Sequence, residues 1–136
     1  MRTILAIIFM TFATQASAEE LSLVCETTSE VFHQSNSKGE TTAYDETITN
    51  LKTEILFDGQ SVEASFPLFK AYCKNFDTEW KKNDIESFCF ENNTSSSLKI
   101  SRLTGLVKYS FIISPDDGSR SAYFYKGQCK KSKKMF

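Results

Sequence analysis

The sequence predicts an all-β domain, either a small antiparallel β-barrel or a sandwich, that ends in a C-terminal meander of strands. Short segments in which apolar and polar residues alternate recur along the chain, and turn signals separate them about every eight to twelve residues. The composition agrees, because the 12 Phe and 5 Tyr residues favour strands over helices. We expect roughly seven to nine short strands, which is typical of sandwiches and closed barrels.

The N-terminal half is expected to form three strands joined by polar turns. These strands cover 21–26, 47–57 and 62–66. Residues 29–33 either continue the first strand or start another, and the polar segment 34–42 predicts a loop. Asn50 is a candidate break in the second strand. Asp58-Gly59 is the strongest hairpin signal of the chain, and Pro67 ends the third strand or places it at an edge.

The segment from Leu68 to Asp84 has two interpretations. Its apolar residues recur at a four-residue spacing, at Leu68, Tyr72, Phe76 and Trp80, which favours one short helix. A pair of irregular strands explains the same residues equally well, so both alternatives stand at this point.

The C-terminal half carries the clearest pattern of strands and turns. The expected strands are 85–90, 98–102, 107–113 and 122–128. The expected turns are 92–97, 104–105 and 115–118. Consecutive strands on short turns form a meander. In the last strand, Tyr123 and Tyr125 share one face and Phe124 lies on the other, whereas the basic tail from Lys130 to Phe136 is expected to fray.

The first eighteen residues have the features of a cleavable export signal. Arg2 gives a positive start, Ile4 to Phe12 form a short apolar run, and Ala16-Ser17-Ala18 is a small-residue cleavage site. The apolar run is too short to span a bilayer. We therefore expect a signal peptide over 1–18, cleavage after Ala18, and a single domain over 19–136 that is periplasmic or secreted.

The four cysteines are expected to form two disulfides, because an even number of cysteines in an exported chain is typical of disulfide pairing. Three connectivities exist, and we favour Cys25–Cys129 with Cys73–Cys89. The first pair would join the first and last strands, and the second would close a local loop. No C-x-x-C spacing occurs, which argues against a zinc knuckle or a thioredoxin-type site.

Charge and motifs exclude several functional classes. The formal net charge is −1, and removing the signal makes the chain slightly more acidic, so we expect no nucleic-acid partner. His33 is the only histidine and lies beside a polar segment, where a surface role is the ordinary one. Neither a metalloprotease helix motif, a phosphate-binding glycine loop nor an EF-hand spacing occurs. We therefore expect no enzymatic activity, catalytic residue, metal or cofactor.

A set of motifs spread over the chain resembles small exported proteins of Gram-negative bacteria. The matching positions are Cys25 in an early strand, Trp80 at mid-chain, the I-x-R-x-T-G turn of Ile100 to Gly105, and the terminal G-x-C of Gly127 to Cys129. Most proteins of this kind have no assigned activity. The resemblance implies an envelope protein with a β fold and specifies no chemistry.

A second similarity is to the periplasmic inhibitors of c-type lysozyme, which are small disulfide-bonded β-barrels. They insert an S-G-x-x-Y loop into the lysozyme cleft, and this chain has T-G-x-x-x-Y from Thr104 to Tyr109. Thr replaces Ser, and one extra residue precedes Tyr. The similarity implies inhibition of a lysozyme-like enzyme as an alternative function.

The residues expected to contact a partner are Arg102, Thr104, Gly105, Tyr109, Lys130 and Lys131. Arg102 either binds an anionic group with its guanidinium or holds the turn to a neighbouring carboxylate. The C-terminal lysines either contact an anionic membrane surface or form a solvated tail. We expect an exported, non-enzymatic binding protein of the bacterial envelope, whose partner is an envelope protein or a small apolar ligand carried in a barrel.

Overall fold

The computed structural model describes residues 20–132, which form one antiparallel sheet of eight strands and contain no helix. The strands are β1 (Glu20–Ser35), β2 (Thr41–Asp58), β3 (Ser61–Ala64), β4 (Asp77–Trp80), β5 (Asp84–Glu91), β6 (Thr94–Ser101), β7 (Leu106–Ile113) and β8 (Arg120–Lys131). The all-β prediction is therefore confirmed. The predicted signal peptide and its cleavage site lie outside the described residues, as do positions 133–136.

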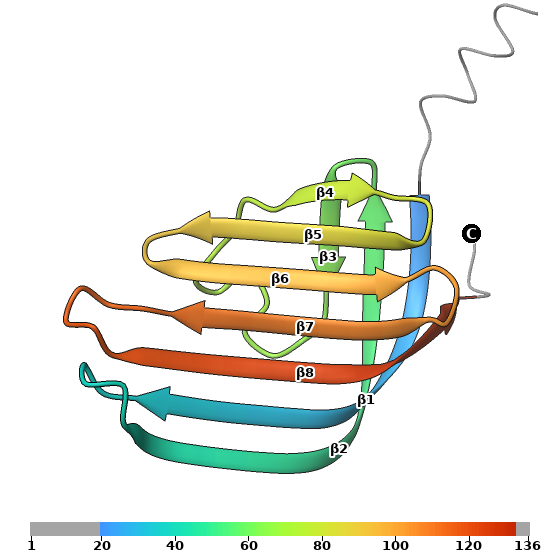
Figure 1. The fold of residues 1–136 in the computed structure, drawn as a ribbon. Coiled ribbons are helices and arrows are strands. Elements are labelled where there is room, and N and C mark those ends of the chain that lie inside the picture. The colour runs from blue at the N-terminus through green and yellow to red at the C-terminus, as the bar shows by residue number, and fades with distance from the viewer. Residues whose placement is uncertain (1–19, 133–136) are drawn as a thin grey trace, which may run out of the picture.

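The sheet curls into a barrel that almost closes. Its strand order is β3-β2-β1-β8-β7-β6-β5-β4, so the two ends of the sheet are β3 and β4 (Figure 1). These end strands approach each other, and the Trp80 indole N–H donates to the Gly59 carbonyl across the opening at 2.9 Å. Strands β6, β7 and β8 pair consecutively, which confirms the predicted C-terminal meander. Among the described strands no backbone ladder joins β3 to β4, so these two short strands remain the edges of the sheet.

Two strands are much longer than the alternation pattern predicts. β1 has 16 residues and β2 has 18, and the two pair along most of their length. Both bend strongly (Figure 1), and the register between them shifts between Thr27, which pairs with Leu51, and Ser29, which pairs with Ile48. A bulge of this kind lets one strand turn a barrel corner without ending. The candidate break at Asn50 is therefore wrong, and residues 29–33 continue β1.

Two-residue turns set the register of two hairpins. Gly59, with φ of +59°, lies in the loop that joins the paired residues Asp58 and Ser61. The second loop consists of Asn92 and Asn93 alone, both in the left-handed region, where asparagine is tolerated better than most residues. The predicted turn over 92–97 is too long, because residues 94–97 belong to β6.

Of the two interpretations of the segment from Leu68 to Asp84, the short helix is absent and the pair of strands is confirmed only as the single short strand β4, because residues 65–76 form turns and irregular backbone. Leu68 and Lys70 both have positive φ, near +60°, and a right-handed helix cannot contain such residues. Leu68 and Tyr72, which the four-residue spacing placed on a helix face, are exposed. The buried side chains of this segment are Phe66 and Cys73, and the half-buried Phe69 packs against the core.

Aromatic side chains fill the interior of the barrel. The Phe66 ring lies 4.8 Å from the ring of Tyr109 and 5.8 Å from the ring of Tyr125, so the 65–76 segment packs a ring against the inner face of β7 and β8. Phe69 stacks on Phe76 at 5.0 Å and also approaches Tyr109. The middle of the barrel is consequently occupied by protein. A ligand must therefore be sought nearer its ends.

Both predicted disulfides are confirmed. Cys25 on β1 lies directly opposite Cys129 on β8, and their sulfur atoms are bonded. The second disulfide, Cys73–Cys89, ties the 65–76 segment to β5. Two disulfides are consistent with an oxidising compartment such as the periplasm or the extracellular space.

Candidate functional site

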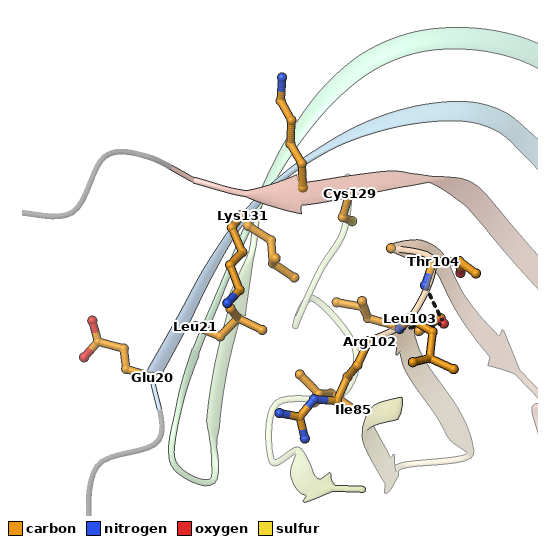
Figure 2. Close-up of a pocket in the computed structure, with 13 residues that line it drawn as sticks. Glu20, Leu21, Ile85, Arg102, Leu103, Thr104, Cys129 and Lys131 are labelled. Atoms are coloured by element: carbon orange, nitrogen blue, oxygen red, sulfur yellow. Dashed lines mark hydrogen bonds between the residues drawn. The ribbon is translucent and has the colours of Figure 1, made fainter. Parts of the chain in front are cut away.

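A pocket of about 580 Å³ opens at one end of the barrel (Figure 2). It is bounded by the start of β1, the turn between β6 and β7, and the end of β8. Its apolar lining includes Leu21, Leu23, Ile85, Ile100 and Cys129. Of these, all but Leu21 are buried, so they form an apolar floor beneath the opening. The volume falls within the range of roughly 300–1,000 Å³ that small-molecule pockets occupy.

The turn from Ser101 to Gly105 forms one wall of this pocket. The Ser101 hydroxyl oxygen accepts hydrogen bonds from the backbone N–H groups of Leu103 at 3.3 Å and Thr104 at 3.1 Å. The Thr104 hydroxyl oxygen accepts from the N–H of Leu106 at 3.3 Å. Short hydroxyl side chains favour turns through such bonds to nearby backbone. The Ser101 and Thr104 hydroxyl groups therefore fix the backbone of the turn that forms this wall.

Gly105 joins this turn to the end of β8. Its N–H donates to the Ser101 carbonyl at 2.9 Å, and its own carbonyl accepts from the N–H of Cys129 at 2.7 Å. Its φ of +76° lies in the left-handed region, and a Cβ atom at this position would clash with the Cys129 carbonyl oxygen. Glycine is therefore required here, both for the turn and for the close approach of the two chain segments.

Arg102 carries a positive charge to the rim of the pocket. Its backbone N–H donates to the Asn83 carbonyl at 2.7 Å, and one guanidinium N–H donates to the Lys81 carbonyl at 2.8 Å. Within residues 20–132, no carboxylate lies within ion-pairing distance of this guanidinium. One donor thus fixes the side chain to the β4–β5 turn, and its charge is not neutralised by a protein acid.

Lys131 supplies a second cation on the opposite side of the opening. Figure 2 shows its side chain descending beside Leu21, while the Arg102 guanidinium faces it from the turn. The Glu20 carboxylate points away from both. Lys130 also lines the rim and is exposed. The pocket therefore combines an apolar floor with a cationic rim.

Five of the six residues predicted for partner binding meet at this pocket. They are Arg102, Thr104, Gly105, Lys130 and Lys131. The sixth, Tyr109, is buried in the aromatic core, where its hydroxyl lies 3.4 Å from the Ser96 hydroxyl. Burial raises the pKa of this Tyr109 phenol. Tyr109 points inward because it alternates along β7 with the exposed Lys108.

The apolar floor was not predicted as part of a site. Leu23, Ile85 and Ile100 follow the inward alternation of their strands, which predicts only that they face the core. The signal that distinguishes them is position, because each lies near the end of a strand at the open end of the barrel. Alternation alone does not reveal whether the end of a barrel is covered.

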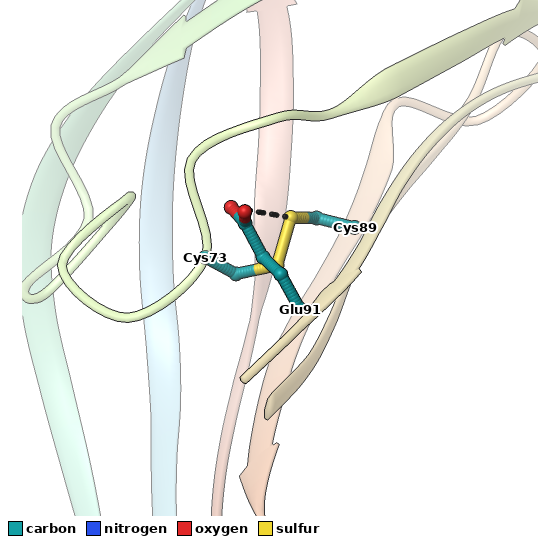
Figure 3. Close-up of side chains that lie close together, drawn as sticks. All are labelled: Cys73, Cys89 and Glu91. Carbon is teal, nitrogen blue, oxygen red and sulfur yellow. Dashed lines mark hydrogen bonds between the residues drawn. A yellow bond between two sulfur atoms is a disulfide. The ribbon is translucent and has the colours of Figure 1, made fainter. Parts of the chain in front are cut away.

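A second cluster joins Glu91 to the Cys73–Cys89 disulfide (Figure 3). The spacing of these three side chains would suit a metal ion, but both sulfur atoms are consumed by the disulfide. The Glu91 carboxylate instead accepts backbone N–H bonds from Lys74 and Asn75, and these bonds lower its pKa. This carboxylate therefore holds the 65–76 segment against β5.

His33 lies apart from both clusters, on the outside of β1. Its Nε2 lies 3.1 Å from the Thr41 hydroxyl, and its ring meets the edge of Tyr44 at 6.2 Å. Within the described part of the chain, no hydrogen bond joins His33 to an acid or to a cysteine. The contacts of His33 are those of a surface residue that supports the β1–β2 hairpin.

Comparison of the chain with protein-family models, with curated proteins and with solved structures finds no match. Among residues 20–132, no helix is long and apolar enough to cross a membrane. The function must therefore be argued from the chemistry of the chain itself.

Proposed function

We propose that this protein is an exported, non-enzymatic binding protein of the bacterial envelope, and that its ligand is an anionic amphiphile. The ligand lies in the pocket at the open end of the barrel. Its apolar part rests on Leu23, Ile85 and Ile100, and its anionic group is held by Arg102 and Lys131. A fatty-acid carboxylate and a lysophospholipid phosphate share this chemistry.

One observation carries the proposal, namely that two cations, neither of which forms an ion pair with an acid among residues 20–132, lie on opposite sides of an opening with an apolar floor. A purely apolar ligand would not pair with the charge of Lys131 or with that of Arg102, which the hydrogen bond to the neutral Lys81 carbonyl leaves in place. A purely ionic ligand would make no use of the apolar lining, in which the half-buried Leu21 lies over the buried Leu23, Ile85 and Ile100. Arginine suits the task, because its planar guanidinium binds carboxylate and phosphate oxygens through two parallel hydrogen bonds.

Export is supported by the N-terminal signal features and by the two disulfides. Disulfides persist in the periplasm and outside the cell, whereas reducing systems remove most of them from the cytosol. Export also suits the ligand, since membranes are the source of anionic amphiphiles in the envelope.

A protein partner is the second candidate, and one specific observation favours it. Leu103 lies at the tip of the Ser101–Gly105 turn and is 75% exposed, so this apolar side chain is available to enter a cleft of another protein. This is the arrangement that inhibition of a lysozyme-like enzyme would use. Tyr109, the other residue of the T-G-x-x-x-Y motif, is buried and cannot take part.

Native mass spectrometry of the untagged protein, purified without detergent from a periplasmic extract, tests the proposal. We expect a mature chain that begins at Glu19 and carries a lipid-sized adduct. The double variant Arg102→Gln with Lys131→Gln should lose the adduct. The matched control removes one arginine and one lysine at the opposite end of the barrel, Arg120→Gln with Lys38→Gln, and should retain it.

Three outcomes would contradict the proposal. An adduct of protein size on the wild-type chain would support the second candidate instead. Equal loss of a lipid-sized adduct from the test variant and the control would show that overall charge, and not the pocket, holds the ligand. A bare wild-type chain that also fails to bind added dodecanoate would exclude an anionic amphiphile.

A further inference from the structure

Basic residues are segregated on three adjacent strands. β6, β7 and β8 lie side by side in the sheet and contain no Asp or Glu (Figure 1). Their basic residues are Lys99, Lys108, Arg120, Lys126, Lys130 and Lys131. The whole chain has a net charge of −1, so this wall of the barrel differs sharply from the rest.

Three of these lysines form a row across the outer face. Lys99 on β6 lies directly opposite Lys108 on β7, and Lys108 lies directly opposite Lys126 on β8. All three are exposed, because they alternate with inward residues of their strands. Side chains in such positions have Cβ atoms about 4.5–5.5 Å apart, and like charges there destabilise a sheet.

Protein acids neutralise only one end of this row. Lys99 lies 3.5 Å from the Glu86 carboxylate and 3.9 Å from that of Asp84. Within residues 20–132, no carboxylate comes within 4.0 Å of the ammonium group of Lys108 or Lys126. A row of like charges that folding disfavours and the protein leaves unpaired is explained by an anionic partner.

Exposed aromatic residues flank the basic row on the same face. The neighbouring cross-strand row contains Phe88, Ser97, Ser110 and Phe124. Both phenylalanines are more than two-fifths exposed, and Phe90, one row further along β5, is 80% exposed. Phe90 lies opposite Ser95 on β6, and Ser95 lies opposite the half-buried Ile112 on β7. Apolar side chains grouped on an outer surface mark interaction sites.

We propose that the outer face of β5 to β8 docks this protein on an anionic phospholipid surface. The row of Lys99, Lys108 and Lys126 contacts lipid phosphates, and Phe88, Phe90 and Phe124 enter the headgroup region. Charge complementarity selects the partner, because lysines without acidic partners are attracted to the negative potential of an anionic leaflet. The proposal uses none of the pocket residues, so it is tested separately from the ligand proposed above.

The pattern favours a lipid surface over a soluble polyanion. A polyanion needs cations alone, and bare phenylalanine side chains beside them would add nothing to its affinity. Peripheral membrane proteins combine basic side chains with apolar ones that reach the boundary between headgroups and acyl chains. Both features lie here on one continuous wall of four paired strands.

Co-sedimentation with vesicles tests the docking. We expect the wild-type protein to bind vesicles of phosphatidylglycerol and phosphatidylethanolamine, but not vesicles of phosphatidylcholine. Lys108→Gln with Lys126→Gln should lower the partition coefficient about 25-fold, since each lysine near an anionic surface contributes about fivefold. Phe88→Ser with Phe124→Ser should also lower binding, and its effect should persist in high salt. The matched control is Lys38→Gln with Lys52→Gln, which removes the same charge away from this face.

Several results would overturn the proposal. Equal binding to neutral and anionic vesicles would remove the role of charge, and equal losses in the lysine variant and its control would remove the role of this face. A wild-type protein that binds soluble polyglutamate but not anionic vesicles would have an acidic protein partner instead. Unchanged thermal unfolding of each variant shows that a loss of binding is not a loss of fold.

Discussion

Gly105 lies where the chain needs both an unusual backbone angle and free space. We predict that Gly105→Ala lowers the free energy of unfolding by more than about 2 kcal/mol, because it combines left-handed strain with a clash against the Cys129 carbonyl. Chemical denaturation measures the change. Gly39→Ala is the matched control, since Gly39 has φ of +80° but a Cβ atom at this position would meet nothing within 4 Å. An equal decrease in the free energy of unfolding in both variants would contradict this, because it would mean that the clash with the Cys129 carbonyl adds nothing to the backbone strain.

Lys126 and Lys108 lie directly opposite each other on neighbouring strands, so their like charges repel. Lys126→Gln should increase the free energy of unfolding by about 0.2–1 kcal/mol, because it removes a directly opposed like-charge pair. The gain should shrink in high salt, which screens exposed charges. Denaturation at low and high ionic strength checks both statements. A lower free energy of unfolding in this variant would contradict the prediction, because it would mean that the lysine row stabilises the fold.

Glu91 links acidity to the order of the 65–76 segment. Hydrogen bonds from the Lys74 and Asn75 backbone lower its pKa, so the folded state binds the ionised form better than the unfolded state does. The resulting stability is fully present above the ordinary pKa of 4.5 and is lost as the pH falls through the lowered value.

Hydrogen exchange of the Lys74 and Asn75 amides tests this link. Relative to an unstructured peptide, their protection should decrease as the pH drops below about 4.5. Glu91→Gln should have low protection at every pH, whereas Glu40→Gln, a change in the β1–β2 loop, should behave like the wild type. Protection of the wild-type amides that stays constant down to acidic pH would contradict the assigned role.

At the scale of elements, the 65–76 segment acts as a plug for the barrel. Phe66→Ala should destabilise the fold by about 3–5 kcal/mol, because it removes a buried ring stacked on Tyr109 and near Tyr125. Leu68→Ala, on the exposed side of the same segment, should cost less than about 1 kcal/mol. Thermal or chemical unfolding of the two variants gives the comparison, and similar small losses would show that the segment packs loosely.

Most strands could be predicted, because period-2 alternation reports directly which side chains face the core. The Asp58-Gly59 hairpin and the meander from β6 to β8 follow from that rule and from turn chemistry. The 65–76 segment could not be predicted, since its path depends on left-handed residues such as Leu68 and on insertion of Phe66 into a core assembled from distant strands. The lengths of β1 and β2 depend on a bulge whose β2 side includes Asn50, which the sequence marks as a candidate break and not as a point where the strand continues.

At the scale of the whole molecule, both proposed sites depend on the nearly closed barrel, the pocket at one end of it and the docking face on one wall. The sequence indicates most of the cationic rim of the pocket, because Arg102, Lys130 and Lys131 stand out by charge. It does not reveal the floor, since Ile85 and Ile100 resemble any other core residues of their strands. Pairing of β7 with β8 brings the end of β8 beside the β6–β7 turn, and only the curl of the sheet brings the start of β1 and Ile85 of β5 to the same opening.

The lysine row on the outer face of β6 to β8 also depends on how the strands pair. Lys99, Lys108 and Lys126 lie on three consecutive strands, and the register of these strands makes them neighbours. The confirmed Cys25–Cys129 disulfide fixes β8 against β1, so it supports both the pocket rim and the register of this wall. Binding at the end and docking on the wall would place an amphiphile site close to its membrane source.

The central claim is that the pocket at the open end of the barrel binds an anionic amphiphile. The most direct test is a titration of the ¹⁵N-labelled mature protein with dodecanoate below its micellar concentration, in which the amide chemical shifts are measured at each step. We predict saturable shifts at Leu21, Leu23, Ile85, Gly105 and Lys131, and their loss in the Arg102→Gln variant with Lys131→Gln. Shifts confined to the opposite end of the barrel, around Lys38 and Arg120, or no saturable shifts at all, would contradict the assignment of this pocket as the binding site.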